Sequence, residues 1–145
     1  MTSRRSTLLA QRLLFAVLIV CTAAARGEWK VIAETSGAAP GMAYDTARTS
    51  YEPPYLTTWT RVELSAPATL SNGVEYLSVL QKVAVDCDSQ TWGVAYSAFF
   101  ASADASGAAA YVHSLPREQW ELRPARAGSN GAGLLRVLCS TPRPW

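Results

Sequence analysis

The side chains of this sequence that could do chemistry are few: one histidine, three cysteines and 11 carboxylates. His113 alternates with Tyr111 and Leu115 in a stretch that predicts a strand, and no nucleophile-elbow motif accompanies it. A structural histidine is therefore the simpler interpretation. Zinc needs several histidine or cysteine ligands, which this sequence does not provide.

The segment Asp86-Cys87-Asp88 places two carboxylates around a cysteine near the end of an expected strand. Two carboxylates could suggest calcium, but no third acidic ligand or glycine follows at the spacing of a calcium loop, so a charged strand end at a turn is the simpler interpretation. The glycines lack the flanking strand and lysine of a phosphate loop. We predict a protein that is not an enzyme and has no cofactor or metal. A carboxylate-dependent hydrolase that uses Asp86 and Asp88 is the minor alternative.

The first 25 residues have the features of a secretory signal peptide. Arg4, Arg5 and Arg12 precede an apolar run over residues 13–20, and alanines at 23–25 supply the small residues that a signal peptidase reads. We therefore predict cleavage before Arg26 and an exported mature domain of residues 26–145. The periplasm, the outer surface and the surrounding medium are all compatible with this leader.

Two alternatives for the leader stay open. An uncleaved membrane anchor is the first, although a spanning helix wants roughly 20 apolar residues and this run is shorter. Lipid attachment at Cys21 is the second, although Val20 puts a branched side chain where the lipoprotein peptidase needs a small one.

Removal of the leader changes both the charge and the cysteine content. Three of the 13 basic residues lie in it, so ten remain against 11 acidic residues, and this balance does not suggest a nucleic-acid-binding protein. The mature chain keeps Cys87 and Cys139, for which an oxidising compartment allows one pairing. We expect this disulfide to stabilise the domain by roughly 4 kcal/mol.

Short apolar stretches separated by turn residues predict a meander of antiparallel strands. The sharpest turn signal is Asn72-Gly73, because both residues tolerate positive φ. Ser129 is the expected N-cap of a short C-terminal helix that carries Leu134, Leu135, Leu138 and Cys139 on one side. A strand over residues 134–139 is the alternative, because Gly131 and Gly133 weaken a helix. The six expected strands cover residues 29–34, 42–46, 57–65, 75–87, 92–100 and 109–115. The predicted fold is α+β, with a roughly six-stranded antiparallel meander sheet and one C-terminal helix packed across it, tied by the Cys87–Cys139 disulfide.

Five tryptophans and six tyrosines are many for so small a domain. Tyr51, Tyr55 and Trp145 lie in expected loops or at the chain end, so they are the candidates for contact with a partner. Four other aromatic residues are expected to pack in the core, since they lie on predicted strands: Trp59, Tyr76, Trp92 and Tyr96.

The spacing of several motifs resembles the surface-adhesin protein E-like domain of proteobacterial secreted proteins. These motifs are Trp29-Lys30-Val31, Tyr44-Asp45, Trp59, Tyr76-Leu77-Ser78, Lys82, Val85-Asp86-Cys87, Trp120, Pro124, Gly128-Ser129 and Val137-Leu138-Cys139. The resemblance covers essentially the whole mature chain and implies about six antiparallel strands, one C-terminal helix and a Cys87–Cys139 bridge.

The same resemblance implies a surface protein whose partners are host extracellular-matrix or envelope proteins, because the founding adhesin binds host extracellular proteins. No motif locates the binding residues. A periplasmic structural or assembly role is the alternative.

Overall fold

The structure is a computed structural model, and it describes residues 28–32 and 41–140. Its elements in chain order are β1 (Trp29–Val31), β2 (Met42–Asp45), η1 (Thr46–Arg48), β3 (Ser50–Glu52), β4 (Tyr55–Thr69), β5 (Glu75–Asp86), β6 (Thr91–Phe100), β7 (Tyr111–Ser114), η2 (Arg117–Gln119), β8 (Arg123–Pro124) and α1 (Asn130–Ser140). Here η marks a short 3-10 turn. The predicted signal peptide, Cys21 and Trp145 lie outside the described residues.

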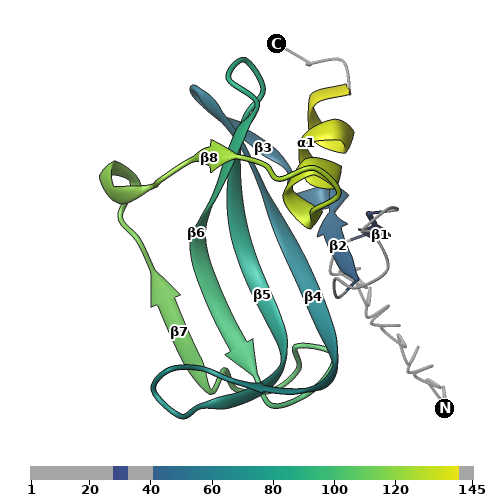
Figure 1. Cartoon of the computed structure of the whole chain (residues 1–145), viewed down its shortest axis with the longest axis vertical. Helices are drawn as coiled ribbons and strands as arrows, with labels where there is room; N and C mark the ends of the chain where they lie inside the picture. The colour runs from purple at the N-terminus through teal and green to yellow at the C-terminus, as the bar shows by residue number, and fades with distance from the viewer. Residues whose placement is uncertain (1–27, 33–40, 141–145) are drawn as a thin grey trace, which may run out of the picture.

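The strands form one open antiparallel sheet in the order β1-β2-β4-β5-β6-β7 (Figure 1). This order follows the chain, so the predicted meander of six strands and the α+β fold are confirmed. Two short strands were not predicted: β3 pairs with β4, and β8 pairs with β6. Both are too short for an alternating pattern, and prolines follow or end them, which confines them to the margin of the sheet.

The hairpin of β4 and β5 forms the centre of the sheet. Its turn contains Asn72 and Gly73. Gly73 takes a positive φ of 85°, as expected, but Asn72 does not, so the expectation of positive φ at both positions is only half right. β4 is longer than expected and continues to Thr69 across an irregularity between Glu63 and Ala68. Pro67 lies in this irregular stretch, where a missing N–H removes no ladder hydrogen bond.

The helix α1 packs against one face of this sheet (Figure 1). It begins after Ser129, whose Oγ accepts the Ala132 N–H at 3.3 Å, as expected for its N-cap. Leu134, Leu135 and Leu138 are buried in the core formed with Val83, Val85 and other apolar strand residues. The Cys87–Cys139 disulfide joins the last turn of the helix to the residue after β5, as predicted.

Close approach of helix and sheet explains one glycine of α1. A Cβ added at Gly131 would overlap the Trp92 indole. A side chain at this position would therefore push the first turn of the helix off the sheet. The glycine that weakens the helix by propensity is required here by packing.

Candidate functional site

The two faces of the sheet differ in what covers them. Val62, Val79 and Val83 belong to the same core cluster as the leucines of α1, so the residues that alternate with them point to the opposite face, away from the helix, which we call the open face. Cross-strand partners share a face, and one row of partners crosses the open face from edge to edge: Val31, Ala43, Arg61, Leu80, Ala98 and Val112. Two clusters of aromatic and charged side chains lie on this face beside that row.

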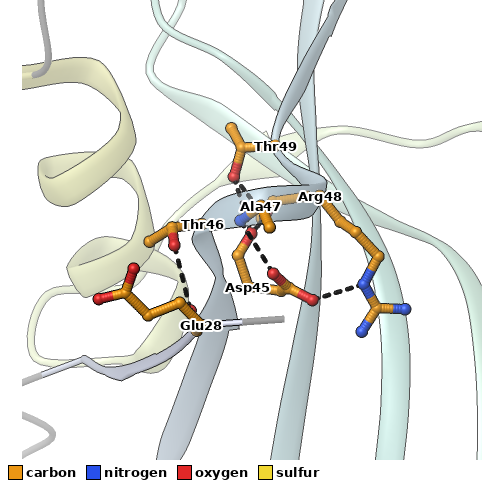
Figure 2. A network of polar contacts seen from close by, with 7 residues as sticks. Glu28, Asp45, Thr46, Ala47, Arg48 and Thr49 are labelled. Carbon is orange, nitrogen blue, oxygen red and sulfur yellow. Dashed lines mark hydrogen bonds and ion pairs between the residues drawn. The ribbon is translucent and has the colours of Figure 1, made fainter. Parts of the chain in front are cut away.

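Asp45 fixes the first cluster at the end of β2 (Figure 2). Its side chain is fully buried, and Oδ1 accepts the Ala47 N–H at 2.9 Å, which caps the η1 turn. Arg48 Nε donates to Oδ2 at 2.5 Å. The Asp45 carbonyl also accepts the hydroxyls of Thr49 and Thr58. This network fixes the backbone at the β2–η1 corner and directs the Arg48 side chain.

The guanidinium of Arg48 lies between two indoles. It is 5.4 Å from the ring centroid of Trp29 and 5.3 Å from that of Trp59. Arg61 lies 5.0 Å from the Trp29 ring, and Tyr96 meets Trp59 edge-on at 5.5 Å. We call these five residues the Trp29–Trp59 cluster. Cation–π contacts at partly exposed sites stabilise such an arrangement by about 0.5–1 kcal/mol each.

The second cluster lies where β3, β4 and the connection from β7 to β8 meet. Lys82 Nζ donates to Glu52 Oε1 at 2.7 Å and lies 5.9 Å from the Trp120 ring centroid. Arg117 lies 5.7 Å from both the Tyr55 and Trp120 rings, which are 6.1 Å apart. We call these five residues the Glu52–Trp120 cluster. Because Trp59 is the register partner of Lys82, the two clusters are neighbours.

Electrostatics in the second cluster favour the ionised form of Glu52. The hydrogen bond from Lys82 lowers the pKa of Glu52, and the Thr57 hydrogen bond and the Arg117 charge act in the same direction against partial burial. Glu52 is therefore ionised and paired with a lysine. A general acid needs the opposite property, a raised pKa that keeps its carboxyl protonated near neutral pH.

The arrangement on the open face is suited to recognition. Arg48 is paired with Asp45, Arg61 with Glu63 and Lys82 with Glu52, so cations and carboxylates alternate on this face. The rings of Trp29, Trp59, Tyr55, Tyr96 and Trp120 are all partly exposed. Aromatic and arginine side chains that are partly exposed and held in place are the residue types that dominate binding energy at protein interfaces.

The residues proposed from the sequence for partner contact are not all brought together. The expectation that Tyr51 and Tyr55 lie in loops is wrong, because Tyr51 is on β3 and Tyr55 is the first residue of β4. Tyr55 belongs to the Glu52–Trp120 cluster, whereas Tyr51, with an exposed fraction of 38%, is the register partner of Leu56 and points to the helix side. Tyr51 and Tyr55 thus lie on opposite faces. Trp145 is not among the described residues.

Of the four strand aromatics expected in the core, only Trp92 packs against the core cluster. Tyr76 is half-buried and packs on Phe99 outside that cluster, and Trp59 and Tyr96 lie on the open face. Alternation places every second residue of β4 there, and nothing in the local sequence distinguishes an indole that faces a helix from one that faces partly into solvent. Arg48 and Arg117 were missed because only the folded chain brings them to these rings.

The candidate catalytic residues take ordinary structural positions. His113 is exposed on β7. Asp86 accepts the backbone N–H groups of Asp88 and Ser89, which is the turn arrangement favoured from the sequence. Residues 28–32 and 41–140 contain no group of three histidine, cysteine or carboxylate side chains placed to hold a metal ion.

One hollow of about 500 Å³ lies between β6 and the connection from β7 to β8. Its walls include Val94, Leu115 and Trp120, with Glu118 and Glu121 among its lining residues. The Glu121 carboxylate pairs with the exposed Arg123 at 2.5 Å, so it is engaged at the surface.

The sequence profile of the family described as surface-adhesin protein E matches residues 29–140. The fold defines a disulfide-bonded antiparallel domain with one face free of the helix. The chain belongs to the surface-adhesin protein E family. Comparisons with curated proteins and with solved structures gave no match. Within the described residues, no helix is long and apolar enough to cross a membrane. Family membership supports a surface adhesin-like role.

Proposed function

We propose that this protein is a non-catalytic adhesin of the cell surface, which binds a host extracellular-matrix protein through its open face. The observation that carries the proposal is the position of Trp59, which lies between Arg48 and Tyr96 at the middle of that face. In the same proposal, residues 1–25 are a signal peptide and the mature protein begins at Arg26. A periplasmic structural or assembly role is the competing function, and it differs in location more than in chemistry.

Two physical arguments support the open face as the binding surface. A partner that covers the partly exposed rings removes apolar area from water, at about 25 cal/mol per Å². The charged groups are already held by internal pairs, so binding loses less side-chain entropy than it would with mobile arginines. Both effects favour a protein ligand with a broad surface over a small solute.

Location is tested first, on intact cells. Protease treatment of the surface should remove the protein while a periplasmic control protein stays intact. If the protein survives and fractionates with the periplasm, the adhesin proposal fails and the periplasmic role takes its place. Intact-mass measurement of the exported protein tests cleavage before Arg26 in the same preparation.

Binding is tested on purified protein with immobilised extracellular-matrix proteins. We expect Trp59→Ala and Tyr55→Ala to weaken binding by about tenfold or more, the range of interface hot spots. Tyr51→Ala on the other face is the matched control for loss of an exposed tyrosine, and Trp92→Ala reports a core change. Equal loss from Tyr51→Ala and Tyr55→Ala, with stability retained, would show that the open face is not the binding surface.

A further inference from the structure

The strand β7 is an uncovered edge of the sheet. It pairs with β6 on one side, and Figure 1 shows β7 at the margin of the sheet with no strand beyond it. All four of its residues are exposed, including Tyr111 at 38% and Val112 at 47%. An edge strand presents a row of backbone N–H and C=O groups that can pair with another polypeptide.

The other outer edges in the described part of the chain carry the residues that prevent such pairing. β1 has Lys30 between Glu28 and Val31, β3 ends in Glu52 before two prolines, and β8 consists of Arg123 and Pro124. Charges and prolines at edges are the usual defence against strand addition. β7 has the sequence Tyr-Val-His-Ser, which contains neither a proline nor a permanently charged side chain.

We propose that β7 is a docking edge that accepts an extended segment of the protein partner as an additional antiparallel strand. This proposal rests on the proposed function, because it assumes that the ligand of the open face is a protein. Backbone groups are what the edge offers, and only another polypeptide in an extended conformation matches their spacing along the whole strand. Antiparallel addition continues the pairing of every neighbour in the sheet.

The side chains of β7 define the segment it would accept. Val112 ends the open-face row that runs through Leu80 and Ala98, so the added strand would place an apolar or β-branched side chain beside Val112. Tyr111 and His113 point to the other face, where neutral or aromatic side chains suit them. A run of like charges in the partner segment has no opposite charge on β7 to meet.

The edge also connects with the open face. Tyr96 of the Trp29–Trp59 cluster is the register partner of Ser114, the last residue of β7. A strand added at β7 therefore lies next to the surface that we propose for the rest of the partner. The edge would fix the orientation of the partner, and the aromatic cluster would contribute contact area.

The test uses the purified protein and peptides selected on it from a random peptide library. We expect the selected peptides to be extended and largely uncharged, and to protect from hydrogen exchange the backbone amides of Val112 and Ser114, which alternate with those that face β6. Val112→Lys should weaken their binding by at least about tenfold, because a charged residue on the edge opposes pairing. Val31→Lys is the matched control, since Val31 is 75% exposed at the opposite end of the same row.

Four results would overturn the proposal: no selected peptide that depends on Val112, protection outside β7, equal loss with Val31→Lys, or a concentration-dependent dimer that Val112→Lys abolishes. The last result would mean that the edge pairs with a second copy of this chain. Failure of the proposed function gives a result that differs from failure of the β7 proposal: matrix proteins do not bind at all, whereas peptides still bind at β7.

Discussion

Replacement of Asp45 by Asn tests whether the buried carboxylate holds Arg48 between the two indoles. The asparagine keeps an oxygen for the Ala47 N–H, so the cap of η1 survives. Its amide nitrogen, however, would face Arg48 Nε, and two donors cannot bond to each other. The change therefore removes one charge-assisted hydrogen bond and the ion pair while it alters the shape of the side chain very little.

The expected loss of unfolding free energy depends on how deeply each side chain of the Asp45–Arg48 pair is buried. A hydrogen bond to a charged group contributes about 1.5–3 kcal/mol to stability. The Asp45 side chain is fully buried, but the Arg48 side chain is 44% exposed, and water can replace part of what the guanidinium loses. We therefore expect D45N to lower the free energy of unfolding by about 1–2 kcal/mol, at the low end of the range for a buried partner.

Urea denaturation at neutral pH, followed by tryptophan fluorescence, measures this loss. The m-value should stay unchanged, because the change affects a local contact and not the compactness of either state. The double variant with Arg48→Gln completes a thermodynamic cycle, for which we expect a coupling of about 1 kcal/mol. Additive losses, or a D45N effect within about 0.3 kcal/mol of zero, would refute the inference that Asp45 positions Arg48.

Three further predictions follow from the fold. The double variant Cys87→Ala/Cys139→Ala should lose about 4 kcal/mol in equilibrium unfolding, since the bridge spans a sequence separation of 52 residues; a loss below about 1 kcal/mol would contradict it. Gly131→Ala should destabilise by about 1–3 kcal/mol despite its better helix propensity, because the added methyl meets Trp92; a higher Tm would show that the helix can shift freely. Glu52→Gln should lower the free energy of unfolding at neutral pH by under about 1 kcal/mol. The pKa of Glu52 is lower in the folded than in the unfolded protein, so ionised Glu52 stabilises the fold fully at pH values above the unfolded-state pKa. That difference should vanish as the pH falls through the folded-state pKa of Glu52, and a difference that persists in acid would contradict the ion-pair explanation.

The sequence was sufficient for the fold because its signals are local. Alternation of side chains predicted the six main strands, Asn72-Gly73 predicted the central turn, and Ser129 predicted the start of the helix. The Cys87–Cys139 bridge followed from the count of remaining cysteines. Each of these features depends on a few neighbouring residues or on a count.

The candidate site was harder to predict because it depends on register and on long-range contacts. Arg48 reaches Trp59 only after β2 has paired with β4, and Arg117 reaches Tyr55 only after the connection from β7 has folded back across the sheet. Proline-rich flanks indicated that Tyr55 lies at a margin, but they did not reveal which face it occupies. The opposite orientations of Tyr51 and Tyr55 follow from β3 pairing, which the sequence did not predict.

The disulfide has a mechanical consequence for the proposed adhesin, which would hold cells to a surface under load. Cys139 is the residue before the end of α1, and Cys87 directly follows a central strand. Tension applied at Ser140 therefore passes through the S–S bond to the middle of the sheet, and the turns of the helix before Cys139 carry little of it. The bridge prevents the chain between Cys87 and Cys139, a separation of 52 residues, from extending under load. The fully extended protein is therefore shorter by about 180 Å.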